Sequence, residues 1–141
     1  MENPQFKMTL FQHALNPIIC IGMSDGNFTE GELNDLKAST AQLSGWFQIT
    51  PEQARKECEA LYDYLTQEVA IGGLKSIYVK VPISCALVHK NLQSDEARNY
   101  IVSFLEDQAL ADGKLNDEEK KMITLYSTII HHGGKAAGIH L

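Results

Sequence analysis

The sequence has few cysteines, and their arrangement excludes a disulfide-rich or zinc-ribbon protein. Its three cysteines, Cys20, Cys58 and Cys85, show no C-x-x-C spacing, and each lies in an apolar stretch. An odd number of cysteines in such positions is typical of reduced, buried thiols in a cytoplasmic protein. The apolar surroundings also favour inert packing over a reactive Cys–His nucleophile.

Long apolar runs are absent as well. The most apolar window, residues 69–88, is interrupted by Lys75, Lys80, Pro82 and a pair of glycines. Such a segment is too broken to cross a bilayer, so we expect no membrane partner. Residues 1–7 carry no basic region of the kind that begins a signal peptide. We therefore expect a cytoplasmic location.

Basic residues are outnumbered by acidic ones. There are 12 Lys and Arg against 18 Asp and Glu, which gives a formal net charge of −6. An acidic surface repels phosphate backbones, so we expect no nucleic-acid partner. Metal cations, or a basic protein surface docking on an acidic face, match this charge better.

The motifs of common enzyme classes are missing too. The sequence contains no G-x-S-x-G, P-loop, G-x-G-x-x-G or H-E-x-x-H pattern. His131 and His132 are adjacent, so on a helix they point to different sides and do not chelate one ion easily. We therefore expect a non-enzymatic protein.

Helical periodicity dominates what is present. Apolar residues from Phe11 to Ile19 follow i, i+3, i+4 spacing, and Pro17 predicts a kink or break there, with Asn16 as a candidate cap. A second helix is expected from Thr29 to Ser44-Gly45. The third begins at Thr50-Pro51, where a Thr cap precedes a proline and Gln53 completes the start signal.

The second half of the chain is also expected to be helical. Residues 74–92 fit both a strand and a longer helix, and we favour a helix bent at Pro82 because of its length. Further helices should run from a cap at Ser94 to Asp112-Gly113, and from Asn116 to His131-His132. With 44% hydrophobic residues, the sequence predicts one all-α domain over residues 1–141.

Two segments of the sequence resemble each other, residues 23–32 and residues 110–119. In each, an Asp-Gly pair is followed by a variable residue, an apolar residue and a capping residue, with a Glu seven positions after the Asp: Asp25 to Glu32 and Asp112 to Glu119. The glycines are suited to the left-handed turn that ends a helix, and the glutamates to a capping box at the start of the next. We expect two tight helix corners related by a pseudo-twofold repeat.

The two aspartates need a further explanation. Asp25 and Asp112 would lie at helix C-termini, where the macrodipole disfavours an anion by roughly 0.3–1 kcal/mol. One explanation is an Asx-turn, in which the carboxylate accepts backbone N–H groups; the other is a bound cation. The spacing matches the second half of an EF-hand loop, but Ile21 and Met23 occupy the preceding ligand positions and cannot ligate calcium.

The repeated corner resembles that of the TerB-like domains of tellurite-resistance proteins and of a membrane-anchored DnaJ-like co-chaperone. The resemblance lies in the apolar helix that ends in Asp-Gly, followed by an apolar residue, a cap and a Glu, present twice. It implies an all-helical fold, a stress-response role and a divalent metal held by Asp25, Glu32, Asp112 and Glu119. Ser24, in place of the usual Ala, and the long middle segment with Pro82 depart from the family pattern.

Three functions remain open at this stage. The leading one is a non-enzymatic TerB-like domain that binds a divalent metal or docks a protein partner through its acidic face. A metal-dependent hydrolase that uses the Asp/Glu corners is the second, because paired carboxylates can hold a catalytic ion. The third is a scaffold without a ligand. Convergence of the two corners in one pocket would favour the hydrolase, and well-separated corners would favour binding or structural roles.

Overall fold

The computed structural model describes residues 6–110 and 117–138, without the side chains of Asp25, Ala136 and Ala137. The described residues form helices and connecting turns, and none of them lies in a β-strand. The all-α prediction is therefore confirmed. The α-helices are α1 (Leu10–Gly22), α2 (Glu30–Thr40), α3 (Pro51–Gly72), α4 (Leu74–Tyr78), α5 (Val81–Asn91), α6 (Asp95–Leu110) and α7 (Asp117–His132). Short 3-10 helices are η1 (Met23–Asp25), η2 (Ala41–Phe47) and η3 (Gly134–Ala137).

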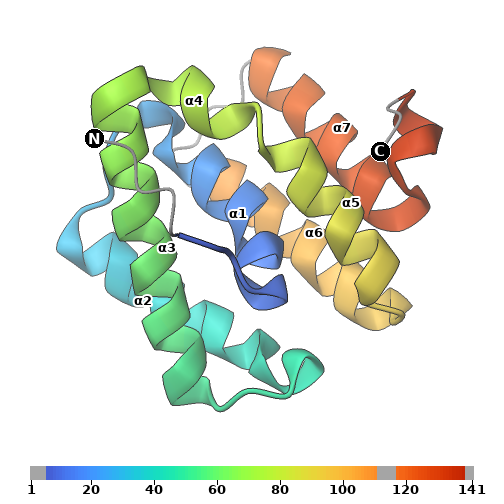
Figure 1. Ribbon diagram of the computed structural model, residues 1–141, viewed down its shortest axis with the longest axis horizontal. Coiled ribbons are helices and arrows are strands. Elements are labelled where there is room, and N and C mark those ends of the chain that lie inside the picture. Colours follow the sequence, from blue (N-terminus) through green and yellow to red (C-terminus); the bar gives the residue numbers. More distant parts are fainter. Residues whose placement is uncertain (1–5, 111–116, 139–141) are drawn as a thin grey trace.

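Helix α1 runs through the middle of the molecule (Figure 1). It packs against α3 on one side and against α5 and α6 on the other, while α2 lies on α3 and α7 lies on α5 and α6. Every residue of α1 from Ala14 to Ile21 is buried, so the helix is covered on all sides. A helix that is apolar around most of its circumference is expected in such a central position.

Pro17 does not divide this central helix. A kink or a break was predicted at Asn16-Pro17. The break and the cap at Asn16 are wrong, because α1 is one continuous helix with both residues inside it, while the kink stays a prediction. The helix is capped at its start by Thr9, whose hydroxyl accepts from Gln12 N while the Gln12 side chain accepts from Thr9 N. Proline removes one backbone hydrogen bond, and burial against α3, α5 and α6 offsets that loss.

The predicted starts of α2, α3 and α6 are confirmed. Thr29 and Thr50 cap α2 and α3 through hydrogen bonds from Glu32 N and Gln53 N, each 3.1 Å long. Ser94 Oγ accepts from Ala97 N at 3.1 Å at the start of α6. Each bond satisfies a helical N–H that would otherwise lack a partner.

The helix predicted for residues 74–92 is interrupted rather than bent. Helix α4 ends at Tyr78, and α5 begins at Val81 after a short turn. Pro82 lies in the first turn of α5, where a missing N–H costs nothing within the helix. Ile77, Val79 and Val81, whose alternate spacing resembles that of a strand, lie in α4, in the turn and at the start of α5.

The core is one continuous cluster that extends from α1 to α7. Trp46 and Phe47, which end η2, are half-buried and close one end of it. The Phe47 ring meets Phe11 edge-on at 5.3 Å, and the Trp46 ring lies 5.5 Å from Tyr100. Among the described helices, none combines the length and apolarity needed to cross a membrane.

Candidate functional site

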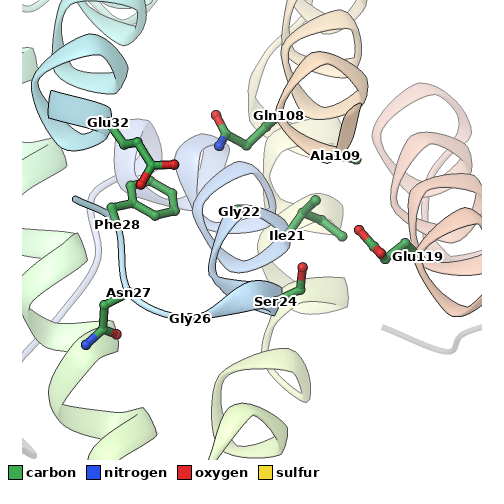
Figure 2. Close-up of a pocket in the computed structure, with 10 residues that line it drawn as sticks. All are labelled: Ile21, Gly22, Ser24, Gly26, Asn27, Phe28, Glu32, Gln108, Ala109 and Glu119. Atoms are coloured by element: carbon green, nitrogen blue, oxygen red, sulfur yellow. The ribbon is translucent and has the colours of Figure 1, made fainter. Parts of the chain in front are cut away.

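A cavity of about 160 Å³ lies where four helix ends meet (Figure 2). The end of α1 forms its floor, and the linker to α2, the last described turn of α6 and the first turn of α7 form its walls. Glu32, from the start of α2, and Glu119, from the start of α7, both line it. Two glutamates that lie far apart in the sequence therefore share one cavity.

Gly22, the last residue of α1, allows the cavity walls to approach each other. A Cβ atom at this position would lie 2.5 Å from Phe28 Cζ and 2.8 Å from Gln108 Nε2. Such distances are below van der Waals contact, so a larger residue would displace both side chains. The absence of a side chain at Gly22 thus leaves room for Phe28 and Gln108 against the end of α1 (Figure 2).

The linker before α2 is held in place by α3. Phe28 N donates to Tyr62 Oη at 2.8 Å, and the two rings stack with centroids 5.2 Å apart. One residue later, Thr29 begins the capping box of α2, and Glu32 Oε1 accepts from Thr29 N at 2.8 Å. These contacts fix the Glu32 carboxylate at the cavity wall while one of its oxygens satisfies the helix start.

Glu119 differs from Glu32 in its exposure. The Glu119 side chain is only 6% exposed, whereas Glu32 is exposed to solvent. Figure 2 shows the Glu119 carboxylate directed toward Ile21 and the end of α1. A carboxylate is rarely buried to this extent unless other groups compensate its charge. Glu119 is therefore the most unusual side chain of the cavity.

The predicted metal ligands are only partly within the described residues. Glu32 and Glu119 line the cavity; Asp25 ends η1 beside it, but its side chain is not described. Asp112 and the rest of residues 111–116 lie outside the described residues, so the second corner stays a prediction. Gly26 has the expected positive φ, 120°, but its ψ of −172° is extended, so it does not form the left-handed helical turn predicted from the sequence; this combination is one that essentially only glycine adopts.

Three oxygen-bearing side chains of the cavity, those of Ser24, Asn27 and Gln108, were not singled out from the sequence as site residues. Ser24 lies on η1 and Gln108 on the last turn of α6, and both line the cavity. For Gln108 the sequence did contain a signal. Gln108 lies four residues before Asp112, a spacing that would place the two residues on one face of a helix extending that far.

The cysteines are buried and unpaired by disulfides, as predicted. Burial raises the pKa of Cys58 from 9.0 to about 11, although a hydrogen bond with Thr40 and the charge of Lys37 lower it in part. Burial also raises the pKa values of Cys20 and Cys85 well above the ordinary range. Thiols held in the neutral form are poor nucleophiles, so the geometry does not favour cysteine catalysis.

A buried polar cluster joins α1 to α5. Ser84 Oγ lies 2.9 Å from His13 Nδ1 and accepts from Asn16 Nδ2 at 3.0 Å, and Cys20 Sγ donates to Asn16 Oδ1 at 3.3 Å. Burial lowers the pKa of His13, which favours the neutral ring. Although Ser and His are adjacent, Ser84 is 1% exposed and a substrate cannot reach it. The cluster is structural.

Within residues 6–110 and 117–138, no group of three or more His, Cys, Asp or Glu side chains is placed to hold a metal ion. The cavity contributes two carboxylates from this part of the chain. Comparisons with protein-family models, with curated proteins and with solved structures find no significant match. The functional argument therefore rests on the cavity and on the repeated motif.

Proposed function

We propose that this protein is a non-enzymatic, TerB-like domain that binds a divalent cation in the cavity between the helix ends. The observation that carries the proposal is that Glu32 and Glu119 line the same cavity. Equivalent residues of two similar sequence segments, at the starts of α2 and α7, thus face one space. Structural capping alone does not require the two glutamates to share a cavity.

The donor chemistry supports a hard cation. The side chains with donor atoms along the cavity are Glu32, Glu119, Ser24, Asn27 and Gln108, and they offer oxygen without imidazole or thiolate. Calcium, magnesium and manganese prefer carboxylate, carbonyl and hydroxyl oxygens. The carbonyl end of α1 also faces the cavity, and its partial negative charge favours a cation.

Asp25 and Asp112 complete the proposed ligand set. Asp25 follows Ser24 at the cavity edge, and Asp112 follows Gln108 by four residues. Either carboxylate, added to Glu32 and Glu119, would give the three acidic groups that a dedicated divalent site commonly needs. When bound, the ion would offset the repulsion among these carboxylates. The same acidic face could serve for docking a protein partner, and a stress-response role is what the resemblance implies.

The shared cavity of Glu32 and Glu119 also supports the second candidate, a metal-dependent hydrolase. Such an enzyme needs, besides the ion, an open coordination position and a general base within reach of the attacking water. Both cavity glutamates are assigned here as ion ligands, and one Glu32 oxygen also holds the cap of α2. We therefore propose that the protein binds the ion without catalysing a reaction. Hydrolysis of a nitrophenyl phosphate ester should be assayed beside the binding experiment.

The test is calorimetric titration and thermal melting with calcium, magnesium and manganese. A ligand that binds only the native state at about 100 times its Kd adds ~2.7 kcal/mol of stability, a shift of about 5–10 °C for a chain of this size. Glu119→Gln and Glu32→Gln should each remove most of the shift while keeping the side-chain shape. Asp25→Asn and Asp112→Asn should each remove part of it.

Matched controls come from the same helices. Glu118 and Glu30 are exposed, lie next to or near the proposed ligands and do not line the cavity. Glu118→Gln and Glu30→Gln change the net charge equally and should leave the metal-induced shift intact. An equal loss in the controls would indicate general electrostatic attraction. If none of the three ions shifts the melting temperature at millimolar concentration, the ligand-free scaffold is the correct reading.

A further inference from the structure

A second cavity, of about 570 Å³, lies between α5, the end of α7 and η3. These segments lie side by side at the end of the molecule that carries the C-terminal part of the chain (Figure 1). The volume falls in the range of small-molecule sites. This cavity shares no residue with the one that holds Glu32 and Glu119.

One wall of this second cavity is apolar and partly open to solvent. Ile83, Ala86 and Leu87 line it from α5, and Ile83 is 49% exposed. On the opposite face of α5, Val81, Cys85 and Val88 are buried in the core. Helix α5 is thus apolar on both faces, although only one face is covered by the protein. Such a helix is expected to bury its second face as well.

The rim of the cavity is basic. Lys90, Lys135, His89 and His132 line it, and none of the described residues that line it is acidic. The net charge of the whole chain is −6, so a lining whose described ionisable side chains are all basic reverses the sign locally. A basic rim over an apolar wall complements a ligand that has an apolar body and an anionic head.

The walls are held by specific contacts. The Nδ1 of His89 donates to the carbonyl of Ile130 at 3.1 Å, which ties α5 to α7. Its ring lies against Gly133, where an added Cβ would be 3.2 Å from His89 Cδ2. The turn after α7 can therefore pack closely onto α5 only with glycine at this position. A cavity with fixed walls is suited to binding without a large ordering cost.

We propose that this cavity binds an amphiphilic carboxylate, with the alkyl or aromatic body on Ile83, Ala86 and Leu87 and the carboxylate at Lys90 and Lys135. The proposal is independent of the cation site. The concave shape and the basic rim favour a small anion over a second copy of this acidic chain, whose surface would have to present the same combination of charge and apolar area.

Decanoate, used below its micelle concentration, is the probe, and calorimetric titration of the full chain is the measurement. We expect one site per chain, at least tenfold weaker binding of the neutral analogue decanol, and no binding of acetate. The double substitution Lys90→Gln with Lys135→Gln should weaken decanoate binding about tenfold. Lys56→Gln with Lys75→Gln is the matched control, because both lysines are exposed and neither lines the cavity.

Ala86→Trp should abolish binding by filling the cavity. If that variant fails to fold, Ile83→Ser removes apolar contact from an exposed position and should weaken binding severalfold. The proposal is overturned if decanoate does not bind below millimolar concentration, or if the control pair weakens it as much as the rim pair. Equal binding of decanol, or a decanoate-independent dimer that buries Ile83, overturns it as well.

Discussion

Gly26 and Gly31 lie five residues apart but differ in backbone conformation, since Gly26 has a positive φ and Gly31 is helical. Gly26 has φ of +120° and open space where a Cβ would be, while Gly31 lies in the first turn of α2, also with room for a Cβ. The cost of alanine at Gly26 would therefore be backbone strain alone, without a steric clash. At Gly31 alanine would replace a flexible residue in a helix.

We expect the two alanine substitutions to have opposite signs. Gly26→Ala should lower the free energy of unfolding by about 1–2 kcal/mol, because the positive φ strains an L-residue. Gly31→Ala should raise it by up to about 1 kcal/mol. Urea denaturation of both variants measures the difference directly. A neutral Gly26→Ala would mean that the linker between α1 and α2 can adopt another conformation, and the described corner would be incorrect.

The position of Glu119 in a cavity shared with Glu32 could not be predicted from the sequence. The motif identified Glu32 and Glu119 as equivalent positions, and the capping box of Glu32 was predictable because its partner is three residues away. That both side chains line one cavity depends on how α1, α2, α6 and α7 pack. Contacts of this range leave little local signal in the sequence, and Ser24 and Asn27 were missed for the same reason.

At the scale of the element, the junction of α1 and α5 depends on the buried cluster around Ser84. Its hydroxyl serves both His13 and Asn16, and all three lie inside or at the edge of the core. Removing the hydroxyl would leave Asn16 Nδ2 buried without this acceptor. A buried polar group that loses its partner costs roughly 1–3 kcal/mol.

Ser84→Ala should therefore destabilise the protein by about 1–3 kcal/mol, measured by chemical denaturation. Ser103→Ala is the control, since Ser103 is exposed on α6 and its loss should change stability by no more than about 0.5 kcal/mol. Both changes replace serine by alanine within a helix, so the difference in helix propensity cancels. Equal effects at the two positions would show that the cluster contributes little to holding α5 on α1.

The helices themselves were predicted where the signal is local. The caps at Thr29, Thr50 and Ser94 involve residues only three positions away, and they were predicted correctly. Of the kink or break predicted at Pro17, the break was wrong because it was judged from intrinsic helix preference. Burial of α1 on several sides, by helices that begin about 30 or more residues later, outweighs the lost hydrogen bond.

At the scale of the whole molecule, α1 should be the most protected segment. It is covered by α3, α5 and α6, whereas α2 packs mainly on α3 and the following η2 and has an exposed outer face. Amides in the core elements exchange only through global unfolding, and those in peripheral elements exchange through local opening.

Native-state hydrogen exchange should therefore show the slowest amides in residues 14–22 and much faster ones in α2. The protection in α1 should correspond to the global free energy of unfolding from denaturation. Faster exchange in α1 than in α2 would contradict the central position of α1 and the architecture built around it.

The central place of α1 has a consequence for synthesis. This helix is made before α5 and α6, which cover it and follow about 60 to 90 residues later. At translation rates of about 5–20 residues per second, an apolar helix waits on the order of 3–18 s for its partners. During that interval the growing chain exposes the apolar surface of α1. The yield of folded protein in the cell should therefore depend on chaperones that bind nascent chains.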